Sequence, residues 1–213
     1  MRKVLVIGPG GSGKSTFARR LSELLNIPVK HLDAFYWRAG WTKPSNEDWV
    51  NTVTELASGD AWIMDGNFGG TLELRLEHCD TIIFLDMPRL LCLWRVTKRR
   101  LRYRNRSRPD MAEGCAEKLD FEFIDWVWNY SHRSRPKVVR LLNEHSGSKQ
   151  VVWLRSNAEV ERFLHDLSLR GAPMDKHEPE TGLSFERVVF FSDAVFAIVI
   201  TLLVLPSRNR NGE

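Results

Sequence analysis

The chain has 213 residues, with 31 lysine and arginine residues against 27 aspartate and glutamate residues, which leaves a net charge of +4. This length suits one α/β domain of ~150 to 200 residues with a short appendage and excludes a second full domain. The three cysteines are far apart and form no C-x-x-C pair, so they predict reduced thiols in a cytoplasmic protein rather than a disulfide framework or a zinc site.

The chain opens with an apolar run and a glycine-rich loop. Residues 3–7 have the composition of a buried parallel strand, and residues 8–15 read Gly-Pro-Gly-Gly-Ser-Gly-Lys-Ser. This is a complete G-x-x-x-x-G-K-[ST] phosphate loop. Residues 14–25 then carry the apolar spacing of a helix. Strand, loop and helix in this order predict a binding site for the phosphates of ATP or GTP.

The residue types of the loop indicate what each contributes to that site. Glycines leave the backbone N–H groups open to phosphate oxygens, and the helix that follows adds its positive N-terminal end. We expect Lys14 to contact the β- and γ-phosphates and Ser15 to ligate Mg²⁺. The predicted nucleotide-binding residues are Gly8, Gly10, Gly11, Ser12, Gly13, Lys14, Ser15 and Thr16.

Strands alternate with helices along the rest of the first 170 residues. We expect strands at residues 29–32, 61–64, 81–85 and 151–154, and helices at 46–58, 71–76, 90–106, 116–130 and 158–169. This alternation predicts a three-layer α/β/α fold with a parallel sheet, and ligands beside the carboxyl ends of its strands. Four residues come at that edge: Gly8, Asp33, Asp65 and Asp86.

Several residues near this edge have a functional and a structural interpretation. Asp33 could act as a general base, as a magnesium ligand or as a helix N-cap. Asp65 and Asn67 could bind a second substrate or only shape a tight turn. Aromatic side chains nearby could stack on a base or a sugar: Phe35, Tyr36, Trp37 and Trp41. We expect three other tryptophans to fill core space: Trp126, Trp128 and Trp153.

A basic segment follows the fourth predicted strand. It holds eight cations within fourteen residues: Arg95, Lys98, Arg99, Arg100, Arg102, Arg104, Arg106 and Arg108. Such a density predicts a partner that carries several phosphates, either a nucleotide or a nucleic acid. A solvated helix face is the alternative interpretation. We expect residues 95–135 to form a basic helical lid over the phosphate loop.

Five stretches of the sequence, four of them outside the phosphate loop, are characteristic when taken together: residues 8–15, 29–33, 62–67, 80–86 and 108–114. Together they resemble the bacterial DNA topology modulation protein family, and the likeness covers roughly residues 1–167. Members of this family are adenylate-kinase-like phosphate-loop NTPases. The resemblance implies an enzyme that uses ATP and Mg²⁺ to phosphorylate a small acceptor. The usual acceptor-binding pattern of adenylate kinases is absent, so AMP is not the predicted acceptor.

The same resemblance implies roles for individual residues. Lid arginines of such kinases clamp the phosphoryl group in transfer, and the matching positions here are Arg95, Arg99, Arg133 and Arg135. With Lys14 and Asp33 they are the predicted catalytic residues, while Ser15 and Asp33 are the predicted metal ligands. A second hypothesis is a regulatory protein that consumes ATP without a small acceptor and binds nucleic acid through residues 95–108.

The composition changes after residue 170. Residues 1–170 form the predicted nucleotide-binding domain, residues 171–186 read as a linker, and residues 188–205 are an apolar run. As a helix this run would span about 27 Å, just enough for a bilayer. Residues 187–198 resemble the first transmembrane helix of a bacterial and endolysosomal potassium-channel family. We expect the tail, residues 187–213, to tether the protein to a membrane or to be a fusion remnant without channel activity. A buried amphipathic helix is the alternative.

Overall fold

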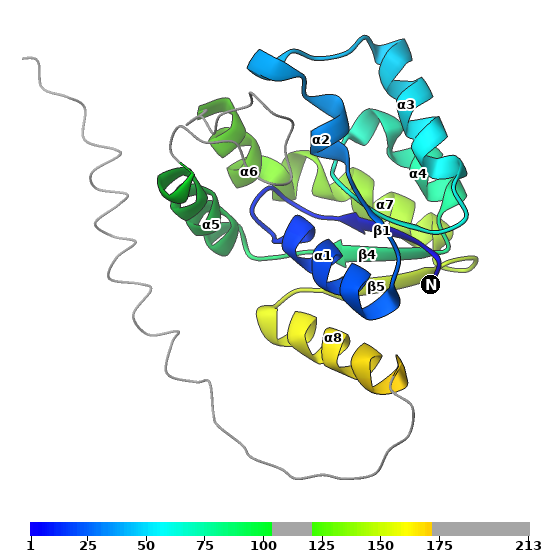
Figure 1. Cartoon of the computed structure of the whole chain (residues 1–213). Coiled ribbons are helices and arrows are strands. Elements are labelled where there is room, and N and C mark those ends of the chain that lie inside the picture. Colours follow the sequence, from blue (N-terminus) through cyan, green and yellow to red (C-terminus); the bar gives the residue numbers. More distant parts are fainter. Residues whose placement is uncertain (104–120, 172–213) are drawn as a thin grey trace, which may run out of the picture. The chain divides into compact units, whose positions relative to one another are not determined.

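Five strands form one parallel sheet in the structure, a computed structural model that describes residues 1–103 and 121–171 (Figure 1). They are β1 (Lys3–Ile7), β2 (Val29–His31), β3 (Trp62–Asp65), β4 (Thr81–Leu85) and β5 (Gln150–Leu154). The strand order is β2-β3-β1-β4-β5. The chain therefore extends the sheet first on one side of β1 and then on the other. In such sheets, ligands bind beside the carboxyl ends of the strands where the order reverses, which here is the end of β1.

Helices and short 3₁₀ turns connect the strands. They are α1 (Lys14–Leu25), α2 (Leu32–Tyr36), η1 (Ala39–Trp41), α3 (Asn46–Ser58), η2 (Gly69–Thr71), α4 (Leu72–His78), α5 (Arg89–Arg102), α6 (Phe121–Arg133), α7 (Arg135–His145) and α8 (Asn157–Gly171). Local chemistry sets some of these bounds. The Ser45 hydroxyl accepts a hydrogen bond from the Asp48 N–H at 3.0 Å and so caps the first turn of α3.

The apolar side chains of the sheet alternate between two helical layers. Leu5 and Ile7 of β1 face a cluster that α3, α4, α6 and α7 complete, whereas Val4 and Val6 face a cluster that α1, α5 and α8 complete. Helices thus cover both faces of the sheet (Figure 1). Alternation along a strand places successive side chains on opposite faces. The predicted three-layer α/β/α phosphate-loop fold is confirmed.

Most predicted elements have nearly the bounds that the sequence indicated. The strands at 3–7 and 81–85 and the helices at 14–25 and 46–58 match the structure. Two helices, α2 and α7, were not predicted. The placement of Trp128 in the core was wrong, because its side chain is 39% exposed with the Arg89 guanidinium over its ring at 4.3 Å. Helix α6 buries Val127 and Tyr130 instead, and neighbouring helix positions point about 100° apart.

Some predictions fall outside the described residues. They are the linker beyond Gly171, the apolar tail at 187–213 and the cations Arg104, Arg106 and Arg108. Within residues 1–103 and 121–171, the structure has no helix that is both long enough and apolar enough to cross a bilayer.

Candidate functional site

The loop between β1 and α1 lies at the carboxyl edge of the sheet, and its conformation requires glycine at two positions. Gly11 (φ 82°) and Gly13 (φ 97°) have left-handed backbone conformations that strongly favour glycine. A Cβ atom on Gly11 would also overlap the carbonyl oxygen of Cys92 in α5. The sequence therefore fixes both the path of this loop and its close contact with α5.

Lys14, the first residue of α1, reaches back over the loop. Its Nζ donates hydrogen bonds to the carbonyl oxygens of Gly8 at 2.8 Å and Pro9 at 2.9 Å. Desolvation by the surrounding protein lowers the pKa of Lys14, while the carboxylates of Asp33 and Asp65 act in the opposite direction. The site thus combines a fixed cation, two nearby carboxylates and the positive N-terminal end of α1.

A cavity of about 1200 Å³ opens above the phosphate loop. Its walls come from the loop and α1, from α2, from the connection between β3 and α4, and from α5 and α6. Most predicted site residues line it: Gly10, Gly11, Ser12, Gly13, Lys14, Ser15, Thr16, Asp33, Arg95 and Arg99. Gly8, Arg133 and Arg135 are not among the residues that line this cavity. The volume is sufficient for a nucleotide together with a second small molecule.

The connection between β3 and α4 supports Gly8 through a hydrogen bond. The N–H of Gly8 donates to Oδ1 of Asn67 at 3.1 Å. Asn67 had two interpretations in the sequence, a ligand contact or turn chemistry. In the structure its side chain supports the first glycine of the phosphate loop, and it also lines the large cavity.

A buried arginine fixes the backbone around Asn67. Arg75 of α4 is fully buried, and its guanidinium donates to four carbonyl oxygens at 2.9 to 3.2 Å, those of Gly66, Asn67, Phe68 and Thr71. Desolvation lowers the pKa of Arg75 to about 9, so the side chain is still a cation at neutral pH. Arg75 therefore positions the connection that in turn positions Gly8.

Strand register brings His31 and Asp65 together. They are paired residues at the ends of β2 and β3, and Nδ1 of His31 lies 2.6 Å from Oδ1 of the buried Asp65. Paired residues of neighbouring parallel strands carry their side chains on the same face of the sheet. Asp65 also lines the large cavity, near Lys14. The carboxylate of Asp65 is thus positioned by His31 at the cavity, and Asp65 is more than a turn residue.

The cations of α5 face the phosphate loop. Arg95 donates from Nη1 to the Ser12 carbonyl oxygen at 3.0 Å and from Nη2 to Oδ1 of Asn157 at 2.7 Å, so it links the loop to α8. Arg99 lines the cavity with its guanidinium 5.9 Å from the centre of the Phe123 ring. Lys98 and Arg102 line the same cavity. These positive charges therefore gather on one wall of the cavity above the phosphate loop.

Arg133 and Arg135 contact carboxylates away from the large cavity. Arg133 donates to Oδ2 of Asp125 at 2.7 Å, and both side chains are exposed. Arg135 at the start of α7 donates to both carboxylate oxygens of Asp86, with three contacts at 2.8 to 3.1 Å. Bonding to Asp86 raises the pKa of Arg135. The role of these two arginines at a transferring phosphoryl group stays a prediction.

Aromatic side chains form another part of the cavity wall. Trp37 and Trp41 line the cavity with their ring centroids 5.1 Å apart, and the Lys43 ammonium lies 5.8 Å from the Trp37 ring. Trp41 has a φ of 64°, which is rare for a bulky side chain. Unusual backbone of this kind often occurs where a protein contacts a ligand.

Ser15 and Asp33 suit Mg²⁺ as ligands because they offer a hydroxyl and a carboxylate oxygen to a hard cation. Both residues line the cavity. Within the described part of the chain, no group of three or more histidine, cysteine, aspartate or glutamate side chains is placed to hold a metal ion. In phosphate-binding sites, Mg²⁺ commonly takes one or two protein ligands and completes its shell with phosphate oxygens and water.

No family model and no curated protein matches the sequence. Among solved structures, the chain is similar to a crystal structure of shikimate kinase from Bacteroides thetaiotaomicron, with a TM-score of 0.43 and 17% sequence identity. The match covers 78% of this chain and 96% of that chain. The fold class of this chain follows from its strand order and its phosphate loop. The two family resemblances in the sequence stay predictions.

Sequence reasoning missed three features of the site: the partner of His31, the hydrogen bond of Asn67 and the buried Arg75. The pairing of His31 with Asp65 becomes predictable only once the neighbouring strand of β2 is known. Arg75 carried no signal, because an arginine in an amphipathic helix normally lies on the solvated face.

Proposed function

We propose that this chain is a Mg²⁺-dependent ATP phosphotransferase that acts on a small acceptor. The observation that carries the proposal is one cavity that joins the phosphate loop, the carboxylates of Asp33 and Asp65, and the cations of α5. Phosphoryl transfer requires mainly positioning and charge stabilisation, and these residue types supply both.

In this proposal the loop backbone and Lys14 bind the β- and γ-phosphates, and Ser15 and Asp33 hold Mg²⁺. The metal would neutralise phosphate charge when bound. Arg95 and Arg99 offset the negative charge that spreads over the γ-phosphoryl oxygens during transfer. The wall formed by Trp37 and Trp41 gives the bound molecules an apolar surface.

The reaction transfers one phosphoryl group. An acceptor hydroxyl oxygen bonds to the γ-phosphorus, the bond from that phosphorus to the β–γ bridging oxygen breaks, and ADP leaves with the bond's electron pair. The hydroxyl proton passes to water, because the carboxylate of Asp33 is occupied by Mg²⁺ in this arrangement. Charge on both sides of the reaction is balanced by this proton release.

The rival hypothesis is an ATP-dependent regulatory protein that binds nucleic acid through residues 95–108. Four cations of this segment line the cavity: Arg95, Lys98, Arg99 and Arg102. A nucleotide can enter such a cavity, whereas a duplex requires cations on an open surface. This placement favours the nucleotide as their partner, so we retain the rival only as an outcome of the test.

The test is ATP consumption by the full chain with Mg²⁺, screened against nucleotides, nucleosides and small metabolites. Lys14→Ala should lower acceptor-stimulated turnover about 10³-fold, because it removes the phosphate-binding cation. Arg140→Ala, an exposed cation of α7, is the matched control and should retain activity. The proposal fails if no acceptor raises turnover above the Lys14→Ala level. Salt-sensitive binding of duplex DNA, lost on charge reversal at Arg102 and Arg106, would then support the rival.

A further inference from the structure

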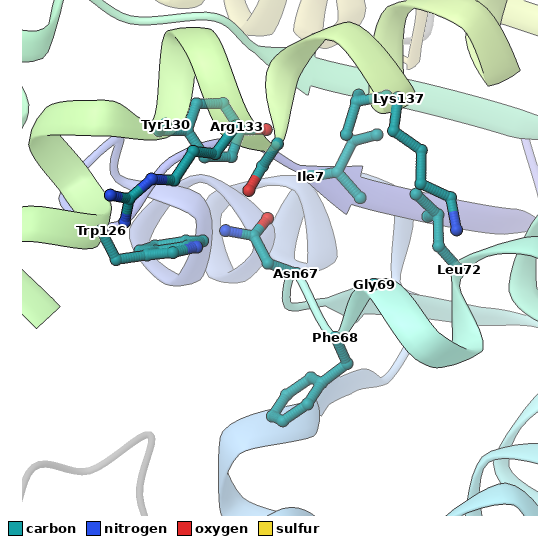
Figure 2. Close-up of a pocket in the computed structure, with 11 residues that line it drawn as sticks. Ile7, Asn67, Phe68, Gly69, Leu72, Trp126, Tyr130, Arg133 and Lys137 are labelled. Carbon is teal, nitrogen blue, oxygen red and sulfur yellow. The ribbon is translucent and has the colours of Figure 1, made fainter. Parts of the chain in front are cut away.

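A smaller pocket of about 360 Å³ lies where α6 and α7 meet the connection between β3 and α4 (Figure 2). Three residues line both this pocket and the large cavity: Asn67, Phe68 and Trp126. The two spaces therefore adjoin at the residue that supports Gly8 of the phosphate loop. Ligand sites of this size take small metabolites rather than whole nucleotides.

Apolar side chains form much of the wall of this pocket. Ile7 at the end of β1, Leu72 at the start of α4 and Val138 in α7 are buried around it. Figure 2 shows the Trp126 ring beside the Asn67 amide, with Ile7 and Leu72 on the other side. Such walls favour a ligand with an apolar body.

Two cations flank the pocket. Arg133 comes from α6 and Lys137 from α7, on opposite sides of Asn67 in Figure 2. Each is exposed and contacts an exposed carboxylate, with Nη1 of Arg133 2.7 Å from Asp125 and Nζ of Lys137 3.1 Å from Glu73. Ion pairs between exposed side chains contribute little to stability. An anionic ligand can therefore join or replace these carboxylates at small cost.

A buried hydroxyl also belongs to the wall. Tyr130 of α6 is 4% exposed, and within the described residues its Oη has no hydrogen-bond partner. Burial, and next the negative charge of Asp86, raise the pKa of Tyr130, so its hydroxyl keeps its proton. Buried donors without a partner are rare and costly in folded proteins. A ligand oxygen would supply what this hydroxyl lacks.

We infer that this pocket is the acceptor subsite and selects a small molecule with an apolar body, an anionic group and a hydroxyl. This inference rests on the proposed function, because the hydroxyl is the group that receives the phosphoryl. The anionic group contacts the exposed cations that flank the pocket, Arg133 and Lys137, and the apolar body packs on Trp126 and Leu72. The shared residue Asn67 brings the hydroxyl end beside the phosphate loop. Arg133 thus contacts the acceptor rather than the γ-phosphoryl group.

Calorimetric titration of the full chain tests the inference with pairs of probes that differ in charge. Benzoate with benzamide and cyclohexanecarboxylate with its amide test carboxylates, and phenyl phosphate with phenol tests phosphates. We expect the anion of at least one pair to bind tenfold more tightly than its neutral partner. Lys137→Gln and Arg133→Gln should remove this preference, and the matched control Arg140→Gln should retain it. Tyr130→Phe should weaken binding of the anionic probe without lowering the melting temperature, because it removes only the hydroxyl that donates to the probe.

Equal affinity within every pair, or a preference that survives both charge-removing variants, would overturn the inference. Lys14→Ala separates it from the proposed function, because this variant should lose ATP turnover and still bind the anionic probe. Anion preference without Lys14-dependent turnover by the wild type would overturn the acceptor assignment together with the proposed function. Acceptor-stimulated turnover without any anion preference would overturn this inference alone.

Discussion

The phosphate loop and the smaller pocket beside it are built in different ways. The loop is one segment, residues 8–15, in which Gly11 packs tightly on Cys92 of α5. The smaller pocket assembles side chains from the end of β1, the connection between β3 and α4, α6 and α7. The loop therefore tolerates little change in its backbone, whereas the wall of the pocket can change one side chain at a time.

Two contacts join these regions. Asn67 accepts the Gly8 N–H, and Arg75 holds the backbone around Asn67. The loop therefore depends directly on Asn67, which lies 59 positions away in the sequence. Four substitutions or modifications test how the loop and its supporting residues work together, and they are given in order of decreasing effect.

The largest effect is expected from Gly11→Ala. The new Cβ would overlap the Cys92 carbonyl oxygen, and alanine is strained at a φ of 82°. Strain and overlap together cost about 4 kcal/mol in this loop conformation. Because the free loop can relax away from it and the nucleotide-bound loop cannot, ADP binding should weaken by up to about 10³-fold in calorimetry. Gly70→Ala is the matched control, because a Cβ there meets nothing within 4 Å. Equal ADP affinity of the two variants would show that the loop does not bind through a fixed backbone.

Arg75→Met should destabilise the fold by about 3 kcal/mol, because it leaves several buried carbonyl oxygens without a donor. The measurement is the free energy of unfolding in urea, with Arg140→Met as the exposed control. ADP affinity should fall as well, since the backbone around Asn67 loses its support. An unchanged urea midpoint would mean that the four hydrogen bonds of Arg75 do not stabilise this connection.

The two described cysteines probe the packing near each region. Cys92 lies against the phosphate loop and Cys79 follows α4, and burial raises the pKa of both thiols to about 11. A raised pKa favours the neutral thiol, so little reactive thiolate exists at pH 8. Iodoacetamide should modify the native protein about 100-fold more slowly than an ordinary thiol, with a rate that rises about tenfold per pH unit up to pH 11.

A Cys115→Ser background confines this measurement by mass spectrometry to the two described thiols, and urea-unfolded protein supplies the reference rate. Rapid native modification of Cys92 with slow modification of Cys79 would show that the packing of α5 on the loop is loose. The phosphate loop would then be the less rigid of the two regions.

The smallest effect is expected from Asn67→Ala. It removes one acceptor from the Gly8 N–H and should weaken ADP binding about fivefold, as expected for a hydrogen bond of about 1 kcal/mol. Asn143→Ala on the exposed side of α7 is the control and should bind ADP like the wild type. An unaltered affinity of Asn67→Ala would mean that the two regions act independently at this contact.

The sequence by itself determined the phosphate loop, the α/β class and the bounds of α1 and α3. These features depend on local chemistry: the spacing of glycines, the period of apolar side chains and the Ser45 cap. The order of residues therefore contains nearly all the information needed to predict them.

Tertiary structure alone decided how the rest of the site is assembled. The contact of His31 with Asp65 depends on β2 lying beside β3, which no local pattern encodes. The pocket beside Tyr130 depends on the packing of α6 and α7 against the end of β1. Long-range packing sets these two features, because their residues are remote in sequence. The carbonyl oxygens that bind Arg75 belong to residues only four to nine positions earlier, but their turn over the buried side chain forms only when α4 packs against the sheet.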